Sequence, residues 1–236
     1  MLKIINFSKN YPNGKVGAKN INLEIKAGDL YAFIGHNGAG KTTTIKAIVG
    51  IHDLTAGDIL MDGISVVKNP MEVKKQLAYI PDNPDVYTAL TGMQYLSFIA
   101  NIFKVDKETF KSLTEKYAAD FELTKDLNNP IASYSHGMRQ KIVLISALIH
   151  QPKLLILDEP FVGLDPKAAF TLKNIMKEHC EKGGAIFFST HVLDVAEKLC
   201  NKVAIIKGGE IIADGLMEDV KKDSSLEAIF LENSNA

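Results

Sequence analysis

The sequence predicts an α/β fold with a largely parallel sheet, and three observations support this. Short apolar runs of strand length alternate with helical patterns through much of the chain. One of these runs, residues 30–34, leads through a glycine-rich turn straight into a predicted helix at residues 41–49. Between about Thr91 and His150 the strand patterns stop and only helical periodicity remains. A helical block is therefore expected within an α/β frame.

The individual elements follow in chain order. Strands are predicted for the apolar runs at residues 2–7, 21–25, 30–34, 77–80, 154–157, 185–189 and 203–206, and a hairpin turn joins the last run to residues 211–213. Helices are predicted at residues 41–49, 93–103, 107–121 and 135–149. We expect one domain over residues 1–236, with an α/β core formed by 1–90 and 151–236 and a helical subdomain over about 91–150.

Composition excludes several classes of protein. The net charge is −1 and Arg139 is the single arginine, which argues against a protein that binds nucleic acid. Cys180 and Cys200 lie far apart without metal-ligand spacing, as expected for a reduced, cytosolic protein. The N-terminus lacks a secretory signal, and the longest apolar runs, such as residues 142–149 with Ser146 interrupting it, are shorter than the about 20 residues that span a bilayer. A function at a membrane would therefore need another chain.

Residues 35–43, GHNGAGKTT, fit the pattern of a phosphate-binding loop. Gly35, Gly38 and Gly40 allow a tight turn whose N–H groups point at phosphate oxygens, and the helix that follows adds the positive end of its dipole. Lys41 can reach the β- and γ-phosphates, and the Thr42 hydroxyl can ligate Mg²⁺. The alternative, a glycine-rich turn with a chance lysine, accounts poorly for motif and context together. The loop predicts a nucleotide site.

Two acids, Asp158 and Glu159, directly follow the predicted strand 154–157. Because side chains alternate along a strand, both acids could not face one side if the strand continued regularly. Alone, such a pair is more often simply solvated. Beside a phosphate loop, Asp158 suits Mg²⁺ binding, and Glu159 suits orienting or deprotonating an attacking water.

These motifs, in this order, make the sequence resemble ATP-binding cassette (ABC) ATPases over nearly its whole length. Residues 35–43 resemble the Walker A segment, 134–141 (YSHGMRQK) the ABC signature, 154–160 (LLILDEP) Walker B and 163–166 (GLDP) the D-loop. His191 matches the switch histidine. Tyr11 matches the aromatic residue that stacks on adenine, although a tyrosine that merely opens the turn at residues 12–14 is a real alternative.

The resemblance implies a phosphate-loop NTPase fold of ABC type, with a mostly parallel core sheet, an N-terminal antiparallel portion and an inserted helical subdomain. It implies ATP and Mg²⁺ as cofactors. Catalytic roles fall on Glu159, His191 and Lys41, and metal binding on Thr42, Asp82 and Asp158. The implied ATP-binding residues are Tyr11, Gly35, His36, Asn37, Gly38, Ala39, Gly40, Lys41, Thr42, Thr43, Ser135 and Gly137.

The resemblance also implies how such chains assemble. Two cassettes pack head to tail, as a homodimer or with a paralogue, and each ATP lies between one chain's Walker motifs and the other's signature. Ser135 suits contact with the partner's ATP because it begins a predicted helix. The serine hydroxyl, the N–H groups of the helix and the helix dipole can then converge on a phosphate. The implied function is an ATPase subunit that energises a membrane transporter of exporter type, held at the inner face of the cell membrane by a separate permease.

Other classes of protein share some of these motifs. A soluble ABC ATPase of an assembly system, of the iron–sulfur cluster type, has a similar size and stays an alternative. Chromosome-maintenance and translation-factor members carry a long insertion or a second cassette that this chain lacks. A small-molecule kinase would share the phosphate loop but would not explain the signature or D-loop segments.

The chain departs from the family pattern at two motifs. His136 and Met138 replace a glycine and a hydrogen-bonding residue of the usual signature, and Asp82 stands where a glutamine is usual. The contacts to the partner's ATP are therefore less firmly predicted than those within the chain. For Arg139 we favour a place facing solvent or a carboxylate over an arginine finger.

Overall fold

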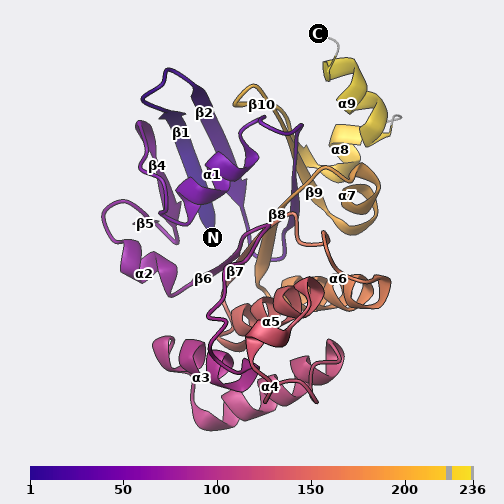
Figure 1. Cartoon of the computed structure of the whole chain (residues 1–236). Helices are drawn as coiled ribbons and strands as arrows, with labels where there is room; N and C mark the ends of the chain where they lie inside the picture. The colour runs from indigo at the N-terminus through magenta and orange to yellow at the C-terminus, as the bar shows by residue number, and fades with distance from the viewer. Residues whose placement is uncertain (222–224, 235–236) are drawn as a thin grey trace.

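The computed structural model describes residues 1–221 and 225–234, and a six-stranded sheet forms its centre (Figure 1). The strand order is β10-β9-β3-β8-β7-β6, and all neighbours are parallel except β10 at one edge. The strands are β3 (Leu30–Ile34), β6 (Leu77–Ile80), β7 (Leu154–Asp158), β8 (Ala185–Thr190), β9 (Lys202–Lys207) and β10 (Glu210–Leu216). Every residue of β3, β7 and β8 is buried, as in a parallel sheet covered on both faces.

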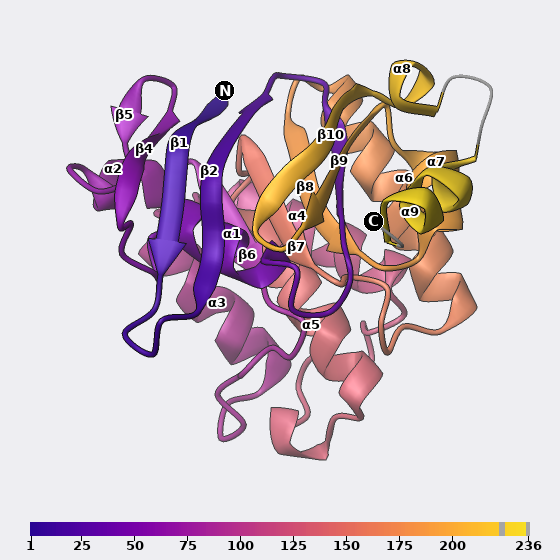
Figure 2. The same cartoon turned by 90° about the horizontal axis from the view of Figure 1, so that it is seen from above.

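A second, antiparallel sheet stands beside the first and has the order β2-β1-β4-β5 (Figure 2). Its strands are β1 (Leu2–Asn10), β2 (Val16–Ile25), β4 (Ala56–Met61) and β5 (Ile64–Ser65). Apolar residues of both sheets and of α1 (Lys41–Ile48) form one buried cluster, which includes Phe7, Phe33 and Ile45. This cluster fixes α1, and therefore the turn before it, against the sheets.

Helices cover the other face of the parallel sheet and form one end of the molecule (Figure 1). That end holds α3 (Gly92–Ile102), α4 (Lys107–Asp120) and α5 (His136–Ile149). Their N-termini are capped by Thr91, Asp106 and Ser135, whose side chains accept backbone N–H groups. The remaining helices are α2 (Pro70–Lys74), α6 (Pro166–Glu181), α7 (Leu193–Leu199), α8 (Met217–Lys221) and α9 (Leu226–Ser234), with a short 3₁₀ turn at Ile131–Ser133.

The predicted α/β class is confirmed, and the differences lie in particular elements. Strands β3 and β6 have the predicted bounds, whereas β2 begins five residues before the predicted 21–25, at Val16. The sequence patterns did not predict β4, because glycine and aspartate interrupt its apolar residues and its pairing with β1 stabilises it. They also missed α6, although Asp165 caps it and Pro166 occupies its first turn.

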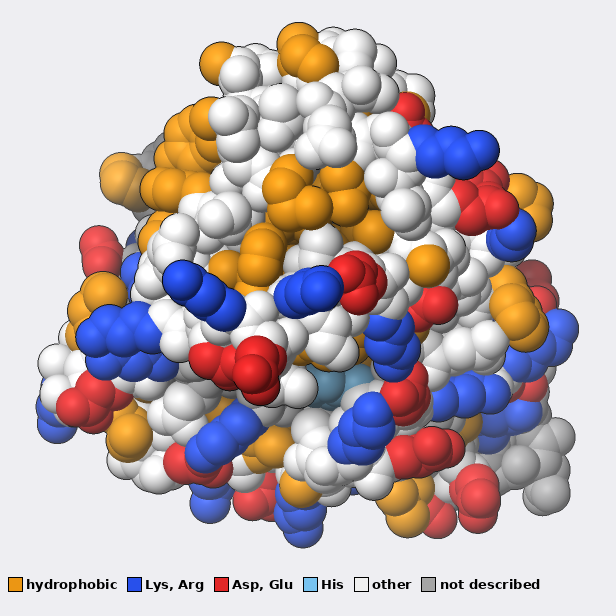
Figure 3. All heavy atoms as spheres, turned by 90° about the horizontal axis from the view of Figure 1, so that it is seen from below, with side chains coloured by type: hydrophobic (Ala, Val, Ile, Leu, Met, Phe, Trp, Pro, Cys, Tyr) orange, Lys and Arg blue, Asp and Glu red, His pale blue; other side chains and the backbone are white. Residues whose placement is uncertain are grey.

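The surface carries charges of both signs. Viewed from below, Lys and Arg side chains are interspersed with Asp and Glu, and hydrophobic side chains gather in the upper half of the view (Figure 3). Exposed hydrophobic residues of α3 include Phe98 and Ile102. Among the described residues, no helix combines the length and hydrophobicity that crossing a membrane requires.

Candidate functional site

The turn between β3 and α1 has a backbone that requires glycine at its end. Gly40 has φ +113°, and a Cβ there would lie 2.4 Å from the carbonyl oxygen of Gly17. Gly38 has φ +82°. Both φ values lie in a region that side-chain-bearing residues rarely adopt. The turn therefore wraps tightly around the N-terminus of α1, where free N–H groups and the helix dipole favour an anion.

Lys41 lies buried inside this turn, with a side chain 7% exposed. Its Nζ donates to the carbonyl oxygens of Gly35 at 2.6 Å and His36 at 3.3 Å, and lies 4.0 Å from Glu159 Oε1. Burial lowers the pKa of Lys41, and the charges of Glu159 and Asp158 oppose that shift. Because carbonyl oxygens are weak partners for an ammonium, a phosphate group would bind this lysine more strongly than its present neighbours do.

Oxygen atoms suited to a divalent cation meet at the start of α1, directly after the turn. Thr42 Oγ1 donates to Asp158 Oδ2 at 2.9 Å, and Ser189 Oγ donates to Asp158 Oδ1. Asp82 lines the same pocket, although its Oδ1 accepts the N–H of Asn83 at 2.9 Å. Hydroxyl and carboxylate oxygens are the ligands that Mg²⁺ prefers, so Thr42 and Asp158 fit that ion. No group of three or more His, Cys, Asp or Glu side chains arranged to hold a metal occurs in the described part of the chain.

The backbone at Glu159 explains how two consecutive acids reach one pocket. Glu159 has φ +48°, in the left-handed region, so the regular alternation of β7 stops after Asp158. The Glu159 N–H donates to the Ser189 carbonyl oxygen at 3.2 Å and to its Oγ at 3.1 Å, which holds this conformation. Both carboxylates consequently line the same hollow.

Glu159 also contacts the predicted switch histidine. His191, which directly follows β8, places Nδ1 2.9 Å from Glu159 Oε2. The Glu159 side chain is 16% exposed and that of His191 is 59% exposed. The carboxylate is thus partly withdrawn from water, while the imidazole that contacts it is mostly exposed. This is a suitable arrangement for a base that takes a proton from water and a donor that holds it in place.

The pocket around Lys41 has a volume of about 410 Å³, and it is lined by Tyr11 as well as by residues of the two Walker motifs. Tyr11 lines it, and its hydroxyl and Thr43 Oγ1 are 3.1 Å apart in a hydrogen bond. Tyr11 also opens the turn that follows it, because its carbonyl oxygen accepts the N–H of Gly14 at 2.9 Å. Tyr11 therefore both begins the turn and lines the pocket.

The signature residues lie outside this pocket. Ser135 is exposed, caps α5 and accepts the N–H of Met138 at 3.2 Å, and neither it nor Gly137 lines the hollow around Lys41. Within the described ranges, Arg139 does not meet the carboxylate expected as one alternative. Its Nη2 donates to the carbonyl oxygen of Ala132 at 3.3 Å, within the turn before α5.

Ser189 is a site residue that sequence reasoning missed. Its hydroxyl donates to Asp158, and both its oxygens accept the N–H of Glu159. It therefore fixes the carboxylate of one acid and the backbone of the other. The signal in the sequence was only its place near the end of a predicted strand, two residues before His191.

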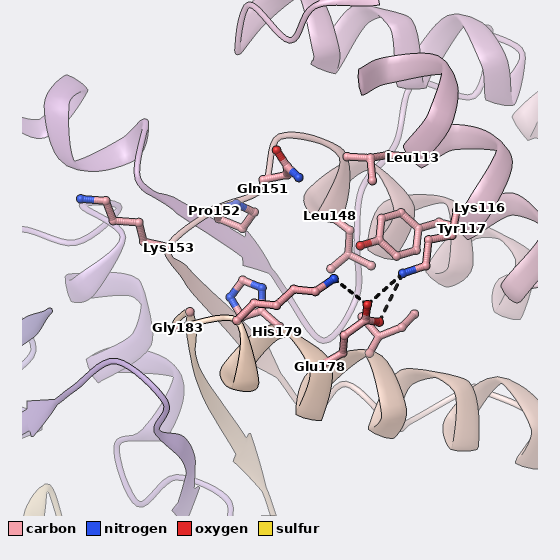
Figure 4. Close-up of a pocket in the computed structure, with 13 residues that line it drawn as sticks. Leu113, Lys116, Tyr117, Leu148, Gln151, Pro152, Lys153, Glu178, His179 and Gly183 are labelled. Carbon is pink, nitrogen blue, oxygen red and sulfur yellow. Dashed lines mark hydrogen bonds and ion pairs between the residues drawn. The ribbon is translucent and has the colours of Figure 1, made fainter. Parts of the chain in front are cut away.

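A different cavity, of about 310 Å³, lies between α4, α5 and α6 and contains none of the predicted site residues (Figure 4). Lys116 and Lys182 both bind the carboxylate of Glu178, at 3.2 Å and 2.6 Å, so their charges are partly compensated. Lys153 points away from the cavity in Figure 4 and pairs with Asp62 at 2.7 Å. We assign this cavity no part in nucleotide binding.

Comparison with known proteins identifies the family of the chain. The sequence matches the ABC transporter family over residues 18–162. EcsA of Bacillus subtilis (strain 168), an ABC-type transporter ATP-binding protein, is 35% identical over 219 residues, which cover 91% of this chain and 89% of EcsA. A solved structure of the ATP-binding subunit of an ABC transporter has a TM-score of 0.95 and 32% identity, covering 99% of both chains.

The ATP-binding cassette MJ0796, solved as a dimer in a post-hydrolysis state with ADP and Pi, has the same fold. Its TM-score is 0.82 at 24% identity, covering 92% of this chain and 99% of that structure's chain. The fold, the phosphate-binding turn and the sequence relatives agree with one another. The chain belongs to the family of ABC transporter ATP-binding proteins, and it is an ATPase of that family.

Proposed function

We propose that this chain hydrolyses ATP at a site shared head to tail between two cassettes, and that it thereby drives a separate permease. The observation that carries the proposal is the separation of the motifs within one chain. Lys41, Asp158 and Glu159 line one pocket and His191 bonds Glu159, whereas Ser135 lies exposed outside the pocket at the N-terminus of a 14-residue helix. A second copy, or a paralogue, would bring its own Ser135 to this pocket.

Each residue then has a distinct part in hydrolysis. Lys41 leaves its carbonyl partners for the β- and γ-phosphates, and Glu159 orients and deprotonates the attacking water. His191 holds the Glu159 carboxylate and contacts the γ-phosphate. Mg²⁺, held by Thr42, Asp158 and Asp82, would neutralise charge on the phosphate oxygens. Tyr11 offers its ring to the adenine, and the loop from Gly35 to Thr43 surrounds the phosphates.

The partner's γ-phosphate would be met by Ser135 and Gly137 at the start of α5. The helix supplies the N–H groups of its first turn and the positive end of its dipole there. ATP would then favour the closed pair of cassettes because it binds both chains at once, and hydrolysis would remove that preference. In this scheme residues 91–150 act as a helical signature subdomain on the α/β core.

A mostly apolar groove supports the proposal that a permease docks on this chain. The groove has a volume of about 380 Å³ and its lining includes Ile51, Tyr79, Ile99, Phe103, Val143 and His150. Ile51 is 56% exposed there. Tyr79 lies on β6, three residues before Asp82 of the nucleotide pocket. A cytosolic segment of a permease seated in the groove would therefore lie against the strand that leads to Asp82. It would hold the chain at the inner face of the membrane.

Affinity purification from native membranes tests the transport part of the proposal. We expect a multi-spanning permease to be recovered with the tagged chain, and inverted vesicles to accumulate its substrate in an ATP-dependent way if transport is export. Recovery of soluble assembly factors alone would contradict the proposal and favour an assembly ATPase. Uptake in the opposite direction would contradict only the exporter assignment.

A further inference from the structure

His136, which stands where the usual signature has glycine, packs against the D-loop of its own chain. A Cβ placed on Gly163 would lie 2.7 Å from His136 Cδ2 and 2.8 Å from His136 Nε2. Such distances are too short for a real Cβ, so the imidazole ring occupies the space that a side chain at position 163 would need. Gly163 also has φ +81°. The backbone therefore favours glycine at position 163, and a Cβ added there would force the His136 ring to move.

Two further contacts join the same helix to the same segment. Gln140 is 1% exposed, and its Nε2 donates to the Pro160 carbonyl oxygen at 3.3 Å. His136 and Gln140 are four residues apart and so lie on one face of α5. Lys141 Nζ lies 2.8 Å from Asp165 Oδ2, and this hydrogen bond lowers the pKa of Asp165. We call residues 160–165, which lead from Walker B into the D-loop, the D-loop segment. The first turns of α5 thus contact this segment at its start, middle and end.

This segment continues directly from the proposed catalytic base. The Glu159 carbonyl oxygen accepts the N–H of Val162 at 3.2 Å, so the first turn of the segment begins at Glu159 itself. Ser135 is the residue immediately before His136 and caps the same helix. A displacement of the start of α5 would therefore move His136 against Gly163 and shift the backbone bonded to Glu159.

We propose that His136 is a positioning residue, which seats the D-loop segment so that contact of Ser135 with the partner's ATP is transmitted to Glu159 in the same chain. The inference rests on the proposed function, because it needs Ser135 to meet a nucleotide on a second cassette. It gives His136 a role that a glycine could not fill.

A double-mutant cycle between positions 136 and 163 tests the role. Gly163→Ala should lower kcat about tenfold and change the KM for ATP less than about twofold, because the new Cβ would displace the imidazole ring from its place on the segment. His136→Gly alone should lower kcat about threefold. In the double variant kcat should exceed that of Gly163→Ala by about threefold or more, because the added Cβ then has room. Both positions are exposed, and thermal unfolding checks that each variant folds.

Gly183→Ala is the matched control, because Gly183 has φ +87° and a Cβ placed on it would meet no other side chain or backbone atom within 4 Å. It carries the same backbone strain without the steric neighbour, and kcat should stay at the wild-type level. A kcat loss in Gly183→Ala equal to that in Gly163→Ala would overturn the inference, as would effects at positions 136 and 163 that simply multiply.

Ser135→Ala distinguishes failure of the proposed function from failure of this inference. If Ser135→Ala leaves turnover unchanged, the proposed shared ATP site is contradicted. If Ser135→Ala lowers turnover but the effects at positions 136 and 163 simply multiply, only the role of His136 is contradicted.

Discussion

His191 Nδ1 and Glu159 Oε2 lie 2.9 Å apart, while the other carboxylate oxygen of Glu159 lies 4.0 Å from Lys41 Nζ. The carboxylate thus lies between an exposed imidazole and a buried ammonium. Glu159 as the proposed base, Lys41 as the proposed phosphate ligand and Asp158 as the proposed metal ligand therefore line one pocket. Substitutions of these side chains should therefore lower the rate of ATP hydrolysis more than they lower the stability of the fold.

Removing the imidazole should slow hydrolysis far more than it weakens binding. His191→Ala is expected to lower kcat by about 10²-fold or more, because Glu159 loses the group that fixes its carboxylate. Binding of a fluorescent ATP analogue should change much less, since the phosphate loop is untouched. Turnover within about twofold of wild type would contradict the role of His191.

Thr42 and the neighbouring Thr43 offer a matched pair for testing the magnesium site. Thr42→Val should lower the affinity for ATP about tenfold when Mg²⁺ is present and have little effect in EDTA, because only the metal-facing hydroxyl is lost. Thr43→Val removes a hydroxyl that bonds Tyr11 instead, so its effect should be the same with and without Mg²⁺. Calorimetric titrations measure both. An equal loss in EDTA for Thr42→Val would contradict the assignment.

His150 should make the stability of the fold depend on pH. Its ring stacks on Phe103 with centroids 3.8 Å apart, and burial lowers its pKa from 6.5 to about 4. Between these values the unfolded chain binds a proton that the folded chain does not, so stability decreases as pH falls through this window. In His150→Phe the decrease should be smaller. Chemical denaturation at a series of pH values measures the difference, and identical slopes would contradict the prediction.

The apolar groove should be needed for the permease and not for the fold. Ile51→Asp places a charge in the groove at an exposed position, so the chain should fold normally but recover less permease from membranes. Phe170→Asp is the control, because Phe170 is 66% exposed on α6 and does not line the groove. Equal permease recovery with both variants would contradict docking at this groove.

The fold was predictable where burial alone decides the structure. Strands β3 and β6 have their predicted bounds because each is a short apolar run that a glycine or a proline ends. Strand β4 was not predictable in this way, because its residues take strand conformation through pairing with β1, about fifty residues earlier in the chain. Asp165 and Pro166 do signal the start of α6, but in the sequence they are also explained by the D-loop motif alone.

The structure brings several of the predicted site residues together, but their geometry could not be predicted from the sequence. The motifs named Lys41, Asp158 and Glu159 directly, and the structure brings them to one pocket. The positive φ of Glu159 could not be read from the sequence, because Ser189, thirty residues later, holds it. The contact of His136 with Gly163 was likewise hidden, since only the fold places the signature beside the D-loop.

The central claim is that one chain holds half of a shared ATP site, and a single variant tests it most directly. Glu159→Gln keeps the size of the side chain and its hydrogen-bonding oxygen but removes the base. With ATP and Mg²⁺, light scattering after size exclusion should show a stable nucleotide-bound dimer that has lost most ATP turnover. The variant without ATP should stay monomeric. A monomer in the presence of saturating ATP, or undiminished hydrolysis, would contradict the account.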